Sequence, residues 1–467
     1  MRSIWAVTLF LLTACGGGND GTSPPATPSD AGKADGAAPP AGDGGELDDA
    51  SPEADALDDR VETGSDTTRD VSIDGPESGP ADVTPTADAR DGDGARDSVP
   101  DLFGDVEPID GGRADGVSSD ATSADAGGPS TGLWLKGDMH VHSKHSTDAM
   151  DTTVAEAIAK AESLGFDYFV LTDHDNHVEG KISTWSDPDY RSDKMVLLYG
   201  AEWTTDKGHA NIFGTKPYDY APIWAARDGD GATSVATAHA QGLHFSVNHP
   251  AAKDLWEAGF DIDFDSMEVW TAPFVLPNSN SNAIAKWDEL LGGGRRLGVR
   301  GGSDSHHQHD LESTLFNIGN PTTWICARAK TGESLLEALK AGHVTVSYAA
   351  TAERLDFTAD VDGDGTYETI VGDNVTPTDG KAIRFKIEIA GFRATSTYNV
   401  TVFKNGTSFK NWQLTAPNVT FEDTPTAGQR AYYRVEARGP TSDAPILSAV
   451  AFGDFIALTN PIYVAFP

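Results

Sequence analysis

The chain has 467 residues and a formal net charge of −38, from 72 acidic and 34 basic residues. This balance argues against nucleic acid as a partner, because phosphate binding needs a basic surface. The chain has two cysteines, Cys15 and Cys326, which excludes a fold that depends on a framework of disulfides.

The first residues indicate a secretory signal. Arg2 is followed by an apolar stretch over residues 4–12 and then by Leu12-Thr13-Ala14-Cys15. That stretch is too short to cross a bilayer as a helix, which needs about 20 apolar residues. Residues 1–14 resemble a bacterial lipoprotein signal, which implies a lipid on Cys15 as the only membrane contact; an ordinary secretory signal is the alternative. With Gly16 next, the resemblance implies a lipid-anchored protein of the bacterial cell envelope, at the outer membrane.

Residues 15–132 have the composition of a tether. Asp and Glu far outnumber Lys and Arg there, and Phe103 is the only aromatic residue after Cys15 in this stretch. Such a segment buries too little apolar surface to offset its chain entropy, so we expect it to be disordered. A flexible chain of this length spans on the order of 60 Å.

Residues 133–467 are long enough for two packed domains, which we expect at 133–349 and 350–467. In the first, apolar positions at the helical period follow Asp151 or Thr152, either of which can cap the helix that begins there. Helices and strands alternate: the helices are expected at 154–164, 278–291 and 331–341, and the strands at 167–172, 196–199, 243–247, 297–301 and 343–348. Repeated βα units predict a parallel sheet, and a closed one if ligands from many strand ends are to meet. The predicted class is therefore α/β, with a distorted barrel.

Side chains that bind metals follow these predicted strands. All 13 histidines lie between His140 and His343. Four short stretches carry most of the ligand types, namely Asp138-Met139-His140-Val141-His142, Thr172-Asp173-His174-Asp175, Asn248-His249-Pro250 and Ser303-Asp304-Ser305-His306. A His-x-His in extended chain places both rings on one face, because side chains alternate with period two. Imidazoles and carboxylates are ligands for Zn, Mn and Fe, so the motifs predict one metal site without choosing among these ions.

The ordered motif set of residues 133–349 resembles the polymerase and histidinol phosphatase (PHP) family of metal-dependent phosphoesterases, in particular the branch that includes the carbaryl hydrolases. The resemblance implies a distorted barrel of seven βα units. It also implies two or three metal ions: one held by His140, His142, Glu202 and Asp304, a second by Glu202, His209 and His249, and a third by Asp148, His174 and His306. The spacing of His209 from Glu202 varies in the family. His145 and Asp151 compete with Asp148 for its role.

Clustered cations would activate water, so no serine or cysteine nucleophile is needed, and the chain has no Gly-x-Ser-x-Gly elbow. We expect Glu202, His306 and Lys207 to take part in catalysis. Arg300 and His307 are further candidates for orienting substrate, although each also fits a plain surface or supporting role, and Trp203 and Trp270 are placed to form an apolar wall. The predicted function is hydrolysis of a small-molecule phosphoester, or of an ester, carbamate or amide. The alternative is a surface-anchored binding protein whose metals are structural and whose C-terminal residues 350–467 bind a glycan or a protein.

Residues 350–467 change to strict alternation, which predicts a small β-sandwich. Lys404-Asn405-Gly406-Thr407 is a predicted hairpin turn. Asp360, Asp362 and Asp364 resemble the first half of a calcium loop, but Val371 stands where an EF-hand has its bidentate Glu. The loop is therefore either a structural Ca²⁺ site or an acidic surface turn. The sequence leaves the oligomeric state open.

Overall fold

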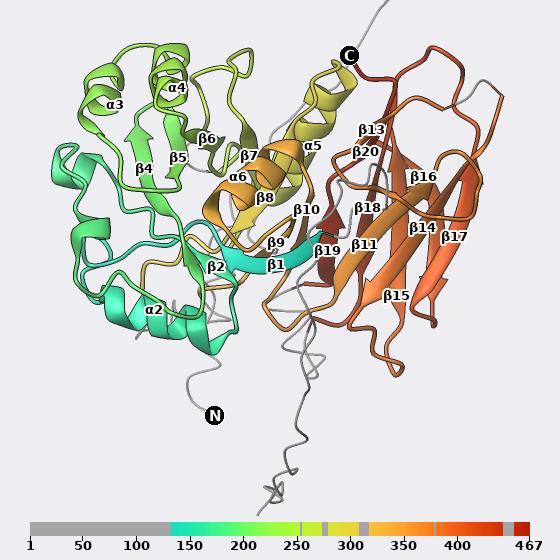
Figure 1. The fold of residues 1–467 in the computed structure, drawn as a ribbon, viewed down its shortest axis with the longest axis horizontal. Coiled ribbons are helices and arrows are strands. Elements are labelled where there is room, and N and C mark those ends of the chain that lie inside the picture. Colours follow the sequence, from blue (N-terminus) through green and yellow to red (C-terminus); the bar gives the residue numbers. More distant parts are fainter. Residues whose placement is uncertain (1–131, 253–254, 273–278, 308–316, 378–379, 442–452) are drawn as a thin grey trace, which may run out of the picture. The chain divides into compact units, whose positions relative to one another are not determined.

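The computed structural model describes residues 132–252, 255–272, 279–307, 317–377, 380–441 and 453–467. The predicted signal with Cys15, and the predicted tether up to residue 131, lie outside these ranges. The described part is mixed α/β, with many strands and few helices (Figure 1). None of its helices is long and apolar enough to cross a membrane.

The largest sheet has eleven strands and joins both ends of the described chain. Its path is β13-β20-β18-β19-β10-β9-β1-β2-β3, and β15 and β16 extend from β18. The strands are β1 (Leu133–Asp138), β2 (Tyr168–Phe169), β3 (Val196–Leu197), β9 (Thr322–Ala327), β10 (Val344–Ser347), β13 (Asn374–Val375), β15 (Tyr398–Lys404), β16 (Thr407–Leu414), β18 (Ala431–Arg438), β19 (Phe455–Thr459) and β20 (Ile462–Val464).

Two smaller sheets complete the strands. A five-stranded sheet has the order β4 (Tyr199–Thr205), β5 (Gly208–Gly214), β6 (His244–Val247), β7 (Ser266–Thr271) and β8 (Gly298–Gly302). A four-stranded sheet has the order β12 (Thr369–Ile370), β11 (Arg354–Asp360), β14 (Ile383–Ala390) and β17 (Asn418–Asp423).

The three helices expected from the sequence are present close to their predicted bounds, and two further helices between residues 221 and 240 were not expected. They are α2 (Val154–Ser163), α3 (Ala221–Ala226), α4 (Gly231–Ala240), α5 (Ser279–Gly292) and α6 (Gly332–Ala341), with short 3₁₀ turns η1 (Asn176–Val178) and η2 (Thr184–Ser186). The cap of α2 is Thr153 rather than Asp151 or Thr152, because Thr153 forms a capping box with Glu156. Helix α6 ends at Gly342, whose φ of 78° suits a residue without a Cβ.

A closed barrel of seven βα units is not confirmed. The described strands form open sheets of mixed direction. The pairs β4–β5, β5–β6, β1–β9 and β9–β10 are antiparallel, whereas β6–β7, β7–β8 and β1–β2 are parallel. Strands β4 and β5 are joined by the two residues Asp206 and Lys207, which is too short for a βα crossover. Two isolated bridges, Val141–Ser305 and His174–Glu202, connect the five-stranded sheet to residues that follow β1 and β2.

The C-terminal strands share one apolar core. Phe357, Phe385 and Phe421 of the four-stranded sheet stack, with ring centroids 5.6 and 4.8 Å apart, and Val400 and Val435 of the largest sheet belong to the same buried cluster. The eleven-stranded sheet continues from β18 through β19 and β10 to β9 and β1, so it joins strands on both sides of residue 349. A separate sandwich over residues 350–467, and the domain boundary at 349, therefore stay predictions.

The hairpin between β15 and β16 follows its sequence signal. Asn405 and Gly406 both have positive φ, 52° and 74°, as a two-residue turn of this kind requires.

Candidate metal centre

The His-x-His segment leaves β1 and runs beside the segment that leaves β8. The N–H of Asp304 donates to the carbonyl of His140 (2.8 Å), and the N–H of His142 donates to the carbonyl of Ser305 (2.9 Å). This pairing brings the carboxylate of Asp304 to both rings: Oδ1 lies 3.1 Å from the Nε2 atoms of His140 and His142. Two segments that lie far apart in sequence thus contribute three predicted ligands to one point.

Glu202, in the middle of β4, is fully buried and lies at the centre of the histidines. Its carboxylate is 2.8 Å from Nδ1 of His174 and 3.3 Å from Nε2 of His140. The other three imidazoles around it are His142 (3.4 Å), His209 (3.3 Å) and His249 (3.6 Å). A carboxylate with two oxygens and five imidazole neighbours has the surroundings expected of a bridging ligand.

An outer group adjoins this centre. Oδ2 of Asp148 lies 3.4 Å from Nε2 of His174 and 3.5 Å from Nε2 of His306. The ring of His306 stacks on His142 with centroids 4.0 Å apart. Of the competitors for the role of Asp148, His145 pairs with Asp187 (3.1 Å) and Asp151 pairs with His307 (2.9 Å).

All nine predicted ligands therefore come together around Glu202 and Asp304. Several sets of three have donor atoms within 4.8 Å of one another and could hold a metal ion, among them His140/His142/Asp304, His140/Glu202/His249, His174/Glu202/His209 and His142/His174/His306. Histidine and carboxylate donors of this kind fit Zn, Mn and Fe. The clusters support divalent metals without fixing their identity or number.

Unsatisfied polar atoms point to the same conclusion. His140 Nε2, Glu202 Oε2 and His209 Nδ1 are buried without a hydrogen bond of good geometry. An orphaned buried polar atom costs about 1 to 3 kcal/mol, so three at one point call for an explanation. A bound cation provides one.

The backbone is also strained at two of the ligands. His249 and Asp304 have positive φ, 23° and 53°, which non-glycine residues rarely adopt. Each conformation is held by a hydrogen bond, from the N–H of His249 to Glu268 (3.1 Å) and from that of Asp304 to His140. Strain of this kind gathers at functional sites.

The charges around the centre depend on one another. Burial alone would raise the pKa of Glu202 and of Asp304, but the imidazoles, His174 foremost for Glu202 and His140 for Asp304, hold both well below their usual values. Burial lowers the pKa of His142, and His306 and His174 lower it further, which favours the neutral ring that binds metals. The ionised carboxylates need positive charge nearby, which protons or cations can supply.

Two groups of predicted residues are not brought to the centre. Lys207 is exposed on the turn after β4, and its ammonium donates to the carbonyl of Gly229 (3.2 Å). In the acidic loop after β11, Asp360 accepts the amides of Gly363 (2.6 Å) and Gly365 (3.1 Å), as in an acidic turn. Asp362 and Asp364 accept loop amides in the same way, so calcium there stays a prediction.

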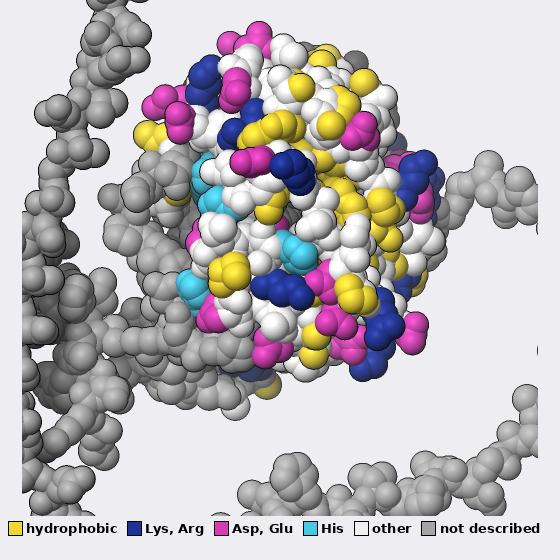
Figure 2. Space-filling model, turned by 90° about the vertical axis from the view of Figure 1, so that its left-hand side faces the viewer, with side chains coloured by type: hydrophobic (Ala, Val, Ile, Leu, Met, Phe, Trp, Pro, Cys, Tyr) yellow, Lys and Arg dark blue, Asp and Glu magenta, His cyan; other side chains and the backbone are white. Residues whose placement is uncertain are grey.

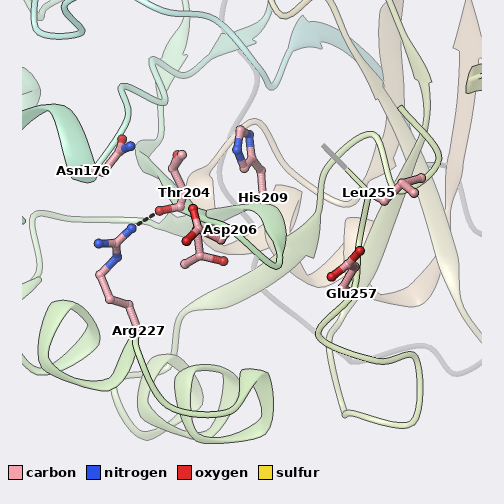
Figure 3. A pocket seen from close by; sticks show the side chains of 8 residues that line it. Asn176, Thr204, Asp206, His209, Arg227, Leu255 and Glu257 are labelled. Carbon is pink, nitrogen blue, oxygen red and sulfur yellow. Dashed lines mark hydrogen bonds between the residues drawn. The ribbon is translucent and has the colours of Figure 1, made fainter. Parts of the chain in front are cut away.

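A cavity of about 350 Å³ opens beside His209 (Figure 3). It is lined by Asn176, Thr204, Thr205, Asp206, His209, Arg227, Leu255 and Glu257. Figure 3 shows His209 and Arg227 on opposite sides, with Arg227 bonded to the carbonyl of Thr204. Figure 2 shows histidine side chains at the surface of one face of the molecule, with acidic and basic side chains on the same face.

The expected tryptophan wall is wrong. Trp203 and Trp270 are each 1% exposed and are absent from the cavity lining, which is mostly polar. Trp203 packs on Phe245 and Trp256 in the core. Trp203 is the neighbour of Glu202 on β4, so strand alternation places its side chain on the opposite face. Trp270 packs on Phe455, with ring centroids 4.9 Å apart.

Sequence reasoning missed three residues that touch the ligands. His177 lies with Asp148 and His174 in a further group that could hold a metal; its place three residues after His174 was a usable signal. Glu268, fully buried in β7, lies 3.1 Å from Nδ1 of His140. Asn248 donates to Glu202 (2.7 Å). Arg300, a candidate either for orienting substrate or for a supporting role, is fully buried and donates to both Glu268 and Asn248.

Comparison with known proteins gives no assignment. No family model and no curated protein matches the chain. Among solved structures, a two-domain Bacteroides vulgatus protein that contains a predicted PHP-like metal-dependent phosphoesterase is 14% identical, with a TM-score of 0.39 over 74% of this chain and 100% of that one. A CARDB domain from Pyrococcus furiosus is 20% identical over 24% of this chain and 94% of that one, with a TM-score of 0.16. At these identities and TM-scores the likeness assigns neither family nor activity.

Proposed function

We propose that this protein is a metal-dependent hydrolase of the PHP type, related to the carbaryl-hydrolase branch, which uses two or three divalent ions to cleave a phosphoester or a related ester, carbamate or amide bond. The observation that carries the proposal is the gathering of nine histidine and carboxylate side chains in one place, with five imidazoles within 3.6 Å of the buried carboxylate of Glu202. A structural zinc site uses four ligands and leaves no open position. This centre has more donors than that and lies beside a cavity.

Ions bound there would lower the pKa of water and neutralise charge on the substrate oxygens. The protein's own residues then have separate tasks. His140, His142 and Asp304 form the inner ligand group, and Glu202 joins it to His209 and His249. His306 donates from Nδ1 to the carbonyl of Asp304 (2.9 Å), which leaves its Nε2 as the atom that binds a cation or carries a proton.

The cavity beside His209 would receive the part of the substrate that is not cleaved. Its volume is at the lower end of ordinary ligand pockets, and its polar side chains, with Leu255 as the apolar exception, favour a small polar group over a large apolar one. The guanidinium of Arg227 already donates to the carbonyl of Thr204 and lies 3.7 Å from Asp175. We therefore expect it to shape the side of the cavity and not to pair with a charged group of the substrate.

For location, we propose a lipid anchor on Cys15 in the bacterial cell envelope, at the outer membrane. The support is the Leu-Thr-Ala-Cys stretch at residues 12–15 and the acidic composition of residues 16–132. Such a chain would hold the catalytic part away from the membrane surface.

The test is hydrolysis by chelator-stripped and reconstituted protein. We expect activity on at least one of p-nitrophenyl phosphate, bis(p-nitrophenyl) phosphate, p-nitrophenyl acetate and an aryl N-methylcarbamate, restored by Zn²⁺ or Mn²⁺ and lost on stripping. His239→Asn is a matched control, since His239 pairs with Asp265 away from the ligands. Turnover that survives complete metal removal would refute the proposal.

A further inference from the structure

One buried guanidinium stands behind the candidate metal centre. Arg300, in β8, is fully buried, and three of its nitrogens have separate acceptors. Nη1 donates to Glu268 (2.7 Å), Nη2 donates to the Asn248 side-chain oxygen (2.5 Å), and Nε donates to the Ser246 hydroxyl (2.8 Å). The planar fork of arginine suits several fixed acceptors at once, whereas a lysine ammonium is a single point charge.

Two paths of hydrogen bonds lead from Arg300 to predicted ligands, and we call each path an arm. The first arm runs through Glu268 to His140 of the inner ligand group. Glu268 accepts from Nδ1 of His140 at 3.1 Å, so the proton lies on Nδ1 and Nε2 faces Glu202 and Asp304. Glu268 also accepts from the N–H of His249 (3.1 Å). A carboxylate behind a metal-binding histidine fixes its tautomer and orientation.

The second arm ends on the bridging carboxylate. Asn248 donates from Nδ2 to Oε1 of Glu202 (2.7 Å). Because the amide oxygen of Asn248 is taken by Arg300, its amide nitrogen is directed to Glu202. The two arms thus leave one guanidinium and end on the two side chains that contact most of the other ligands.

The ion pair between Glu268 and Arg300 distinguishes Glu268 from the predicted metal ligands. Its Oε1 is paired with the Arg300 cation at 2.7 Å, and both side chains are fully buried. The pair is neutral as a whole, so Glu268 serves as an acceptor behind His140 without adding net charge to the centre.

We propose that Arg300 is a positioning residue that couples His140 and Glu202 through Glu268 and Asn248, so that metal binding at the two predicted positions depends on one side chain. The inference rests on the proposed function only in taking His140 and Glu202 as metal ligands. It makes no use of the substrate.

The test is Co²⁺ binding to the full-length protein after metal stripping, followed by titration and by the visible absorption of the bound ion. We expect Glu268→Gln and Asn248→Ala each to weaken Co²⁺ binding by about 10- to 100-fold, the usual effect of losing a group that orients a ligand. The double variant should lose at least tenfold less than the product of the two single losses. The reason is that removing one arm frees Arg300 and so already weakens the other.

Arg300→Lys should weaken Co²⁺ binding about as much as the double variant and change the absorption spectrum. Arg434→Lys is the matched control: Arg434 is 2% exposed and makes a bidentate pair with Asp288 (2.9 and 2.7 Å) outside the centre. It should lower the melting temperature and leave Co²⁺ affinity within about twofold of wild type.

If the loss of Co²⁺ affinity in the double variant equals the product of the losses in Glu268→Gln and Asn248→Ala, the coupling is overturned. This result is decisive even if Arg300→Lys fails to fold. Wild-type affinity and spectrum in a folded Arg300→Lys would overturn it as well. Co²⁺ binding that behaves as expected in a protein that hydrolyses none of the test substrates would leave the coupling standing and refute the proposed function instead.

Discussion

Replacing Glu202 by Gln in metal-stripped protein should reduce stability, and the loss should depend on pH. The Glu202 carboxylate contacts five imidazoles, the nearest at 2.8 Å in His174. Removing one partner of a buried pair costs about 3 to 5 kcal/mol. At about 2 to 4 °C per kcal/mol for a chain of this size, the melting temperature should drop by roughly 10 °C.

The sign of the pH dependence follows from the imidazoles. Burial lowers the pKa of His174, but Glu202 and Asp148 outweigh it and raise the pKa to about 10. A raised histidine pKa gives stability that is complete below the unfolded value of about 6.5 and is lost as pH rises toward the folded value. The pKa of the Glu202 carboxyl is itself lowered. Its contribution to the free energy of unfolding is therefore present at pH values above the usual carboxyl pKa and is lost only in acid. The penalty of Glu202→Gln should thus be larger at pH 6 than at pH 9.

Thermal unfolding of both proteins at pH 6, 7.5 and 9 in chelator measures this effect. Glu353→Gln is the control, because Glu353 is a buried carboxylate paired with Arg393 (2.6 Å), whose charge does not change in this range. Its penalty should be the same at all three pH values. A Glu202→Gln penalty that is below about 1 kcal/mol at pH 6, or that grows toward pH 9, would refute the reasoning.

Three further outcomes can be checked. Gly406→Ala should cost about 1 kcal/mol in denaturant unfolding, because φ is 74° and the added Cβ would lie 3.1 Å from the Tyr432 hydroxyl; an unchanged unfolding midpoint would contradict the turn geometry. Cys15→Ala should move the protein from membranes to the soluble fraction with activity intact, and membrane retention of this variant in fractionation would show another anchor. Lys207→Ala should leave metal content unchanged and alter KM by no more than about tenfold, since its ammonium bonds to Gly229; loss of metal by mass spectrometry would place it in the centre after all.

The sequence alone was enough for the features that depend on local pattern. Helix α2 buries the apolar positions expected of it, Val154, Ala157, Ile158 and Ala161. The hairpin at Asn405 and Gly406 also follows from residues whose preferences are local. Ligands such as His140, His174 and Asp304 could be placed just after strands, because they are polar side chains that follow apolar runs, but Glu202 and His209 lie within β4 and β5.

Features that depend on which strands pair with each other could not be predicted from the sequence. The β4–β5 hairpin turns at Asp206 and Lys207, and no single-sequence signal separated it from a βα unit, so the expected closed barrel is not confirmed. Glu268 lies inside the apolar run of β7, and its use becomes visible only when β7 is seen beside β8 and His140. The sequence left Arg300 either a substrate-orienting or a supporting role, and the choice between them becomes visible only when β8 is seen beside β7.

Mass spectrometry can count the metal ions bound to wild type and to Asp304→Ala purified side by side, and so tests directly whether the predicted ligands form a metal centre. Asp304 Oδ1 lies 3.1 Å from both His140 and His142, so its loss removes a shared donor from the inner group. We expect two or three divalent ions per wild-type chain, fewer in Asp304→Ala, and an unchanged number in His239→Asn. A wild-type chain without stoichiometric metal, or an Asp304→Ala variant that keeps the full complement, would contradict this expectation.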